Sequence, residues 1–432
     1  MDSPLLIRAV ALYLPAAVSA AVWLWRRPNK RQAASALLAG AWCLPSLLLI
    51  NVAAARFGWW RFEVTRGSFL GTPVDLLIGW VLLWGPLASL ALSRISLPAS
   101  IAILAAVDCV LMPLGAPVVT LAPRWLIGEG VAITVCLVPA QLLARWTEAD
   151  IRVSLRAALQ AIAFTGLAAG VLPALILSLT GGSIEPMLRR PFWLNSLYAQ
   201  LLAVPAIIGF SAVQEFALRG HGTPLPYDPP VRLVRTGAYR YVANPMQLAM
   251  SVGLFCGGAM ISSWWVAAAG IVAIVYSAGI AWWDEGRDMR DRFGESWVAY
   301  RAEVRPWIPR WRPIDNPPAT IHVAATCGLC QGIGNWIACR NPVGLTIVPA
   351  ESHPRRSLTR ITYECEGYSD EGVAAFARAL EHINAAWAIA GLAMRLPIVA
   401  GFLQLVADAS GAGPLRIKSE CPRAGVNSGL SS

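Results

Sequence analysis

A polar stretch from Gly220 to Gln247 lies between two long apolar runs and carries residue types that suit ligand binding. Gly220 and Gly222 have no side chains, so the backbone there would allow a ligand to approach closely. Leu233 and Val234 could lie against a planar base. The stretch is therefore a candidate binding loop as well as a connection between apolar segments.

Aromatic rings and a predicted helix start follow in the same stretch. Tyr239 and Tyr241 offer π faces that attract cations. Asn244 and Pro245 predict a turn at the head of the next helix, whose first amides favour an anion such as a carboxylate. Glu285 follows the next apolar hairpin and could hold an ammonium group. A ligand with a sulfonium, an ammonium, a carboxylate and an adenine fits this set, and so does a solvated loop with interfacial aromatic residues.

A second candidate site is the pair Cys327 and Cys330, which follows a predicted strand and opens a predicted helix. The start of a helix lowers the pKa of a thiol and makes it nucleophilic, so a CxxC pair in a βα unit indicates thiol–disulfide chemistry. Zinc binding is the rival interpretation, because Cys339 and His353 are nearby. No second CxxC completes a four-ligand set, and we therefore predict no metal.

These sites belong to a chain with the composition of a membrane protein. Of its 432 residues, 56% are hydrophobic and 14% are charged, whereas soluble proteins carry about 25% charged residues. The formal net charge of +10 indicates cytoplasmic loops that face anionic lipid. No nucleic-acid-binding signature accompanies this charge, so we expect no nucleic-acid partner.

Runs of about 20 apolar residues predict transmembrane helices. Nine candidates follow one another, and the eighth is so short that it would cross only as half of a tight hairpin. They are Leu5–Trp25, Ala34–Ala54, Pro73–Leu92, Ser100–Val119, Ile127–Ala144, Leu155–Leu179, Leu194–Phe216, Gln247–Ser262 and Trp264–Trp283.

Basic loops predict the orientation of these helices. The densest short cluster, Arg26–Arg31, is placed in the cytoplasm, so the N-terminus lies outside and the C-terminal part inside. Asp108 falls in the middle of the fourth span, where an ionisable group is costly and often functional. The structural alternative is that Asp108 pairs with a nearby cation such as Arg8, or with hydroxyl groups of neighbouring helices.

From about Asp315 the chain alternates short strands and helices like a soluble α/β domain, and the tail after Gly411 is expected to be disordered. The predicted strands are His322–Ala325, Leu345–Val348 and Thr359–Tyr363, and the predicted helices are Ile333–Ala338, Asp370–Ile383, Ala385–Arg395 and Ile398–Ala409.

The two polar blocks together resemble a known family. The sequences GHGTP-x-P, LVRTGAYRYVANPM and DEGRDMRDRFGESWVAYRAEVRPWIP are similar, over roughly Gly220–Pro309, to the isoprenylcysteine carboxyl methyltransferase and phospholipid methyltransferase superfamily. The resemblance implies a helical membrane bundle with an S-adenosyl-L-methionine pocket at its cytoplasmic face. It also implies methyl transfer to a lipid-like or isoprenoid-like acceptor.

The family pattern FG-x-x-Y-x-x-Y-x-x-x-V is matched by Phe293-Gly294, Trp297, Tyr300 and Val304, with Trp297 in place of a Tyr. By position, the family acid that holds the cofactor is Glu285. With the two glycines of the loop, the candidate cofactor-binding residues are Gly220, Gly222, Val231, Leu233, Val234, Tyr239, Asn244, Pro245, Gln247 and Glu285.

The chain departs from the family in ways that bear on the acceptor. Gly286 stands where a second Glu is usual, and Ala281 stands where the prenylcysteine branch has an Arg that meets the substrate carboxylate. Ala281 therefore counts against a prenylcysteine substrate. The base for methyl transfer is not identified, with His221 and Glu285 as weak candidates.

The segment His322–Gly413 resembles the DCC family of thiol–disulfide oxidoreductase-like domains, including the helical stretch around Trp387 and Pro397. The resemblance implies a thioredoxin-like fold in which Cys327 and Cys330 carry the redox chemistry. Thr326 stands where the family has an acidic residue before the first cysteine.

Together these observations predict about nine transmembrane helices followed by a small C-terminal thioredoxin-like domain. The predicted divisions are N-terminal helices at 1–145, a methyltransferase core at 146–314, the thioredoxin-like domain at 319–413 and a tail at 414–432. The predicted function is S-adenosyl-L-methionine-dependent methylation of a hydrophobic acceptor in the bilayer. The alternative is a membrane transporter or scaffold whose CxxC domain carries redox activity.

Overall fold

The computed structural model describes residues 3–63, 66–225, 228–354 and 357–414, apart from the side chains of 280–285. The predicted disorder of the tail concerns residues that lie mostly outside these ranges. The chain forms two compact units that interleave along the sequence. The first unit contains Met1–Leu202, Val213–Arg232 and Met250–Gly279, and the second contains Ala203–Ala212, Leu233–Ala249 and Ile280–Ser432.

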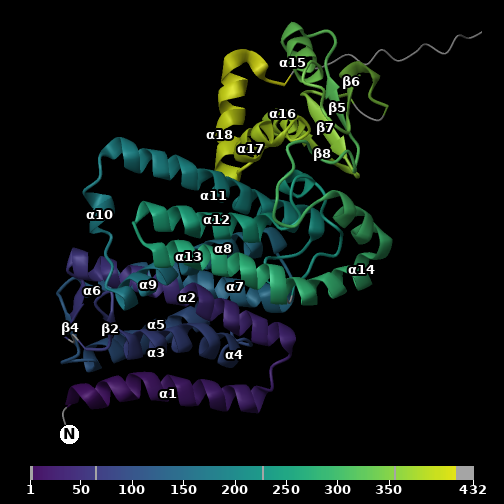
Figure 1. Ribbon diagram of the computed structural model, residues 1–432. Coiled ribbons are helices and arrows are strands. Elements are labelled where there is room, and N and C mark those ends of the chain that lie inside the picture. The colour runs from purple at the N-terminus through teal and green to yellow at the C-terminus, as the bar shows by residue number, and fades with distance from the viewer. Residues whose placement is uncertain (1–2, 64–65, 226–227, 355–356, 415–432) are drawn as a thin grey trace, which may run out of the picture. The chain divides into compact units, whose positions relative to one another are not determined.

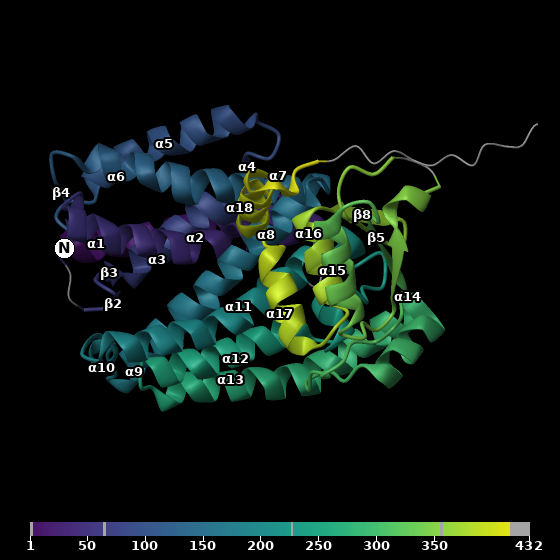
Figure 2. The ribbon, with the colours of Figure 1, turned by 90° about the horizontal axis from the view of Figure 1, so that it is seen from above.

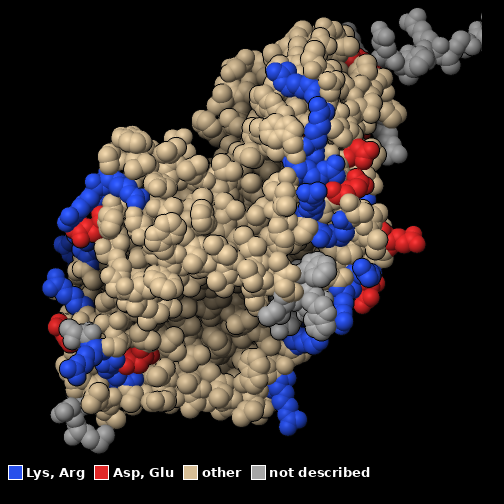
Figure 3. Space-filling view, viewed as in Figure 1, with Lys and Arg blue, Asp and Glu red and all other residues tan. Residues whose placement is uncertain are grey.

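The first unit is built from long apolar helices (Figure 1). Within the described residues, seven helical segments are long and apolar enough to cross a membrane, and they correspond to the first seven predicted spans. They are Pro4–Arg26, Lys30–Phe57, Val74–Ala91, Leu97–Leu114, Trp125–Ala149, Val153–Thr180 and Phe192–Gly220. Figure 3 shows the charged side chains of this unit gathered toward the helix ends, with an uncharged face between them.

The individual helices are shorter than the spans because several spans change helix type. The helices are α1 (Ser3–Arg26), α2 (Lys30–Phe57), α3 (Val74–Leu82), α4 (Ala88–Ala91), α5 (Leu97–Leu114), α6 (Trp125–Ala132), α7 (Val138–Ala149), α8 (Val153–Thr165), α9 (Leu172–Thr180), α10 (Glu185–Leu188), α11 (Phe192–Gly220), α12 (Pro245–Met260) and α13 (Trp264–Tyr276). The core is formed around α2, whose buried side chains pack against neighbours from α3, α6 and α7.

Prolines explain where three of these spans turn into π-helix. The π segments are Leu83–Leu87, Ile133–Leu137 and Gly166–Val171. Pro86 lies inside the first, and α7 and α9, which follow the other two, each carry a proline in their first two positions. A proline lacks the N–H that would bond four residues back, so the hydrogen-bond ladder is displaced locally.

Short strands close the loops at one end of the first unit. Strand β1 (Trp60–Phe62) pairs antiparallel with β4 (Val119–Leu121), and β2 (Ser68–Phe69) pairs with β3 (Thr72–Pro73). The pairing of β1 with β4 joins the loop after α2 to the loop after α5. It thereby fixes the ends of helices that are far apart in the sequence.

Of the last two predicted spans, the first is shorter in the structure than the seven before it, and the second continues without a break into α14. Gln247–Ser262 corresponds to α12, with 16 residues, and Trp264–Trp283 corresponds to α13, with 13 residues and a following π segment, Ser277–Ala281. A helix needs about 20 residues to cross a bilayer. The two helices run side by side in both ribbon views (Figures 1 and 2), as expected for a helical hairpin.

The second unit contains a four-stranded sheet in the order β6-β5-β7-β8. The strands are β5 (Ala319–Val323), β6 (Leu345–Pro349), β7 (Thr362–Cys365) and β8 (Tyr368–Glu371). Strands β5 and β6 are parallel, and the other neighbours are antiparallel. The helices are α14 (Trp282–Glu303), α15 (Gly328–Ala338), α16 (Val373–Leu380), α17 (Ala385–Met394) and α18 (Pro397–Ala407).

One predicted helix of this domain is partly wrong. The prediction Asp370–Ile383 began too early, because Asp370 and Glu371 end β8 and the helix α16 starts at Val373. Strand β8 was missed. A two-residue turn with positive φ at Glu366 and Gly367 connects it to β7, and such turns favour hairpins.

Candidate functional site

The two polar blocks of the sequence are joined by backbone hydrogen bonds within the second unit. The Ala243 amide donates to the Arg305 carbonyl at 3.0 Å, and the Asn244 amide donates to the Pro306 carbonyl at 3.3 Å. The Arg310 amide donates in turn to the Tyr241 carbonyl at 3.0 Å. The second half of the first block therefore lies against the chain segment that follows α14.

Side chains of the motif at the end of α14 fill the space between these blocks. The Tyr300 hydroxyl donates to the Tyr239 carbonyl at 2.9 Å, and burial raises the pKa of Tyr300 well above its usual range, which keeps the hydroxyl protonated. Tyr300 and Val304 form a buried cluster with Ala243, and Trp297 packs at its edge. The aromatic motif therefore acts as a packing element that supports the loop.

Two further residues of the loop tie it to the C-terminal part of the chain. The buried Arg240 guanidinium donates to the carbonyls of Ile314, at 2.9 Å, and Pro317, at 2.8 Å. The Tyr241 hydroxyl donates to the Glu381 carbonyl at 2.9 Å. These bonds explain why the basic and aromatic residues of the loop are buried rather than solvated.

Of the predicted cofactor residues, six lie together in the second unit, within Leu233–Ala249. Val234 and Tyr239 are buried, and Leu233 is half-buried at the edge of the Tyr300 cluster. Asn244 precedes α12, and Pro245 is its first residue, which agrees with the predicted helix start. Gln247 follows in the first turn of α12 and is half-buried.

The remaining four predicted cofactor residues are Gly220, Gly222, Val231 and Glu285. Gly220, Gly222 and Val231 belong to the first unit, where the Val231 amide donates to the Gly220 carbonyl at 2.7 Å. A side chain at Gly222 would come within 2.9 Å of the Pro230 backbone, so protein packing already accounts for this glycine. Glu285 lies on α14, but its side chain lies outside the described residues.

The glycine of the Phe293-Gly294 pair has a clear structural role. Gly294 has φ 51° and ψ −128°, and α14 is two helical pieces that meet at this kink. A residue with a side chain would be strained there. The kink re-aims the second piece of α14, which carries Trp297 and Tyr300 into the packed cluster, and Val304 joins the cluster directly after the helix.

A cavity of about 280 Å³ lies beside the Tyr300 cluster in the second unit. It combines a cation, two carboxylates and small polar groups. Its lining residues are Arg235, Glu295, Ser296, Ala299, Tyr300, Glu303, Ile314 and Asn316. Among the described residues, none of the predicted cofactor-binding side chains is part of this lining.

The CxxC pair lies at the start of α15, as predicted. Cys327 is the residue before the helix, and both cysteines are free thiols. Hydrogen bonds from the Cys330 backbone and thiol, and from the Leu329 backbone, lower the pKa of Cys327. Burial, together with the neighbouring Cys327 thiol, raises the pKa of Cys330 to about 11. The half-buried Cys327 is therefore the more readily ionised thiol of the pair.

Glu351 supports this pair from another element and was missed by the sequence analysis. Its carboxylate accepts the amides of Ala325 and Thr326, both at 3.0 Å, and the Thr326 hydroxyl at 2.9 Å. Burial raises the pKa of Glu351, but these hydrogen bonds outweigh burial and leave the pKa below its usual value. An acid from the 3-10 turn Ala350–Ser352 thus contacts Thr326, the residue before the first cysteine.

The buried Asp108 has a partner other than the one considered from the sequence. Its carboxylate accepts the Trp80 indole N–H at 2.5 Å and makes a side-chain hydrogen bond with Glu129. Arg8 pairs with Asp75 instead, at 2.6 Å. Asp108 and Glu129 line a small cavity of about 30 Å³ with tryptophan and aliphatic side chains of the first unit. Nothing in the sequence spacing links Glu129 to Asp108.

Comparison with known proteins gives no match to any family model, any curated protein or any solved structure.

Proposed function

We propose that the protein is an integral membrane methyltransferase that uses S-adenosyl-L-methionine to methylate a lipid-like or isoprenoid-like acceptor. The observation that supports this best is the joining of the two polar blocks in one unit through Tyr239, Tyr300 and Ala243. The methyltransferase resemblance rests on the same two blocks. A plain connecting loop has no reason to pack against the segment after α14.

In the proposed reaction the acceptor attacks the methyl carbon of the sulfonium in line. The sulfur–carbon bond breaks, the acceptor–carbon bond forms, and S-adenosylhomocysteine leaves with the electron pair of the broken bond. An acceptor that carries a proton loses it to a base or to water. Alignment of donor and acceptor supplies much of the rate, so the residues of the chain act mainly by binding and by excluding water.

Cofactor binding tests this proposal directly. We expect the purified full-length protein in detergent to bind S-adenosyl-L-methionine in calorimetry, and Glu285→Ala and Tyr239→Ala to weaken binding at least tenfold. Val298→Ala, at a half-exposed position of α14, is the matched control. Thermal unfolding shows whether each variant is folded. Equal affinity in wild type, Glu285→Ala and Tyr239→Ala would refute the cofactor site.

The acceptor is identified by methylation of a lipid extract with labelled cofactor, followed by measurement of the mass of the labelled product.

The proposed topology has nine membrane spans, with α12 and α13 as the last two. The N-terminus lies outside, and the C-terminal domain lies in the cytoplasm and has a thioredoxin-like fold.

A second candidate function is thiol–disulfide exchange by the C-terminal domain of a transporter or scaffold. The lowered pKa of Cys327 beside Cys330 favours it. A dithiol titration of the folded protein tests the redox activity, since a redox domain forms a reversible Cys327–Cys330 disulfide. Cofactor binding separates the two functions. A transporter or scaffold has no reason to bind S-adenosyl-L-methionine.

A further inference from the structure

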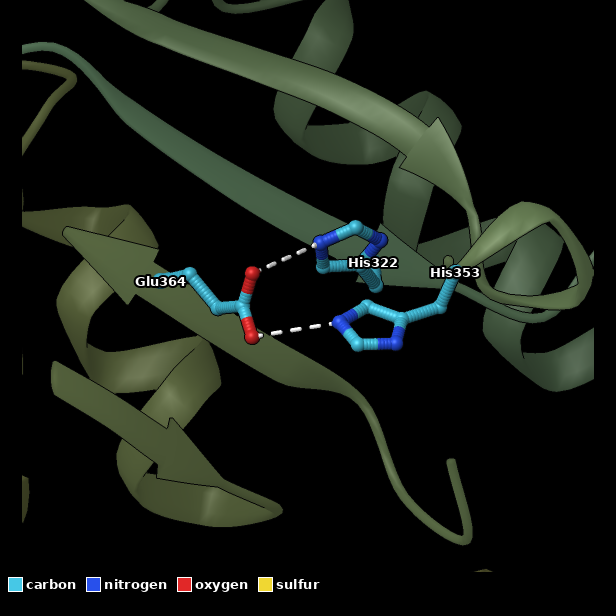
Figure 4. Close-up of side chains that lie close together, drawn as sticks. All are labelled: His322, His353 and Glu364. Carbon is cyan, nitrogen blue, oxygen red and sulfur yellow. Dashed lines mark hydrogen bonds and ion pairs between the residues drawn. The ribbon is translucent and has the colours of Figure 1, made fainter. Parts of the chain in front are cut away.

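Two histidines and a glutamate converge on one face of the C-terminal sheet (Figure 4). His322 Nε2 lies 3.4 Å from Glu364 Oε2, and His353 Nε2 lies 3.3 Å from Glu364 Oε1. One donor atom from each of the three side chains lies within 4.8 Å of the other two. The imidazole rings are arranged edge to face, with centroids 4.9 Å apart.

The register of the sheet explains how this cluster forms. Thr320 on β5 is paired with Glu364 on β7, and His322 is paired with Thr362. Side chains alternate between faces along a strand, so His322 and Glu364 are diagonal neighbours on the same face. The intervening Ile321 points to the opposite face, into the core formed with α15 and α16.

His353 reaches the cluster from a different element. It follows the 3-10 turn Ala350–Ser352, whose Glu351 holds the turn that leads to the CxxC pair. The His353 side chain is 5% exposed and that of His322 is 8% exposed, whereas Glu364 is 38% exposed. The histidines are therefore covered, and the cluster opens to solvent on the side of the carboxylate.

We propose that His322, His353 and Glu364 bind one divalent transition-metal ion, with Zn²⁺ as the best fit. Bonds of about 2.0–2.1 Å to a tetrahedral Zn²⁺ place ligand atoms about 3.3–3.4 Å apart. Each imidazole nitrogen lies at this distance from one of the two carboxylate oxygens of Glu364. Three protein ligands leave a fourth position for water or an anion.

The chemistry of the donors selects the class of metal. Imidazole nitrogens suit Zn²⁺ and other first-row transition metals, whereas Ca²⁺ and Mg²⁺ prefer sets made of oxygen atoms.

The site differs from the zinc set considered from the sequence, in which His353 was placed near Cys339. Cys339 is exposed at the end of α15 and is absent from the cluster. The proposal also leaves the thiols of Cys327 and Cys330 free for other chemistry. It does not depend on the methyltransferase proposal.

Metal titration of the purified full-length protein tests the site. After treatment of the protein with a chelator, we expect calorimetry to show about one Zn²⁺ ion bound tightly per chain. Glu364→Gln and His353→Ala each remove a ligand and should weaken binding at least about 100-fold. His221→Ala removes an exposed histidine of the first unit, and we expect it to bind Zn²⁺ like the wild type.

A double variant, Cys327→Ser with Cys330→Ser, separates this site from a thiolate site. We expect it to retain the tightly bound Zn²⁺. Titration with Co²⁺ should give visible bands of nitrogen and oxygen ligation without thiolate-to-metal charge transfer. This readout uses the wild-type protein, so it is informative even where a variant fails to fold.

Several results would overturn the proposal. One is the absence of tightly bound Zn²⁺ in the wild type. The three side chains would then be held together by histidine–carboxylate hydrogen bonds alone. Another is loss of the tightly bound Zn²⁺ in the cysteine double variant, together with thiolate bands from Co²⁺. A third is unchanged Zn²⁺ affinity in folded Glu364→Gln and His353→Ala. Thermal unfolding without Zn²⁺ shows whether each variant is folded. Added Zn²⁺ should raise the Tm of the wild type and of the variants that keep the site, but not that of Glu364→Gln or His353→Ala.

Discussion

At the scale of single residues, the two thiols of the CxxC pair have opposite environments. Cys327 is stabilised as a thiolate by hydrogen bonds from Cys330, whereas burial and the neighbouring thiol disfavour the thiolate of Cys330. An exchange reaction would therefore begin at Cys327, with Cys330 as the resolving thiol. This division of roles follows from the helix start and needs no metal.

We therefore predict that iodoacetamide at pH 7 modifies Cys327 faster than Cys330. The thiolate is the reactive species, and a pKa of about 11 leaves very little thiolate at Cys330 at this pH. Mass spectrometry of peptides after short labelling measures both rates. The exposed Cys339 provides an internal reference for accessibility. Faster labelling of Cys330 than of Cys327 would contradict the assignment.

Glu351 should make the C-terminal domain sensitive to acid. Its pKa is lower in the folded chain than the ordinary value of 4.5, so its contribution to stability is present above about pH 4.5 and is lost as pH falls through the lowered value. Replacement by Gln should cost about 1 kcal/mol at pH 7, or about 2–4 °C in Tm.

Thermal unfolding of wild type and Glu351→Gln across pH 7 to pH 3.5 measures this effect. We expect the difference in Tm to shrink toward the acid end, because the wild type loses the charged acceptor there. Glu295→Gln, at an exposed position of α14, is the control. A Tm difference that stays constant over this pH range would show that the charge of Glu351 is not involved.

At the scale of elements, the second half of α14 depends on the Gly294 kink and on one buried hydroxyl. Tyr300→Phe leaves the ring in the cluster but removes the donor to the Tyr239 carbonyl. The buried carbonyl then lacks this bond, which should cost about 1–3 kcal/mol. We predict a lower Tm and weaker S-adenosyl-L-methionine binding, measured by thermal unfolding and calorimetry. Equal Tm values for Tyr300→Phe and Val298→Ala would contradict this role.

The elements also show which features a sequence can reveal. The first seven spans were predicted because length and apolar composition are local properties of a segment. The start of α12 at Pro245 and the position of Cys327 before α15 were predicted from local turn and cap signals. Strand β8 was missed although Glu366-Gly367 is a variant of the Asn-Gly hairpin signal.

The partners of the site residues could not be predicted, because they come from distant parts of the chain. Glu129 meets Asp108, and Glu351 meets Thr326, only after helices or strands have packed. The cluster of His322, His353 and Glu364 depends on strand register and on the segment after β6. Sequence spacing contains no direct record of any of these contacts.

At the scale of the whole molecule, the second unit brings a middle part of the sequence together with the C-terminal part. Residues Leu233–Ala249 belong to the same compact unit as the sheet, and Arg240 and Tyr241 supply the bonds between them. The second half of the proposed methyl-donor loop, Leu233–Gln247, and the CxxC pair are thus parts of one unit.

The topology of the helices can be tested at the hairpin of α12 and α13. With seven or nine spans, the count is odd, so an outside N-terminus places the C-terminus in the cytoplasm in both cases. The two topologies differ in the side of the membrane on which they place the turn after α12, near Ser262. Nine spans place that turn outside, whereas seven spans with a re-entrant hairpin keep it on the cytoplasmic side.

We predict that alkaline phosphatase fused after Ser262 is active in a bacterial host, since the enzyme folds only outside the cytoplasm. Fusions after Gly182 should also be active, and fusions after Arg94 or Ser432 should be inactive. The Gly182 fusion is a stringent control, because the nearby Arg189 and Arg190 oppose an outside location. Activity after Gly182 with none after Ser262 would reduce the count to seven. The short α12 and α13 would then lie at the cytoplasmic face, beside the loop proposed to hold the methyl donor.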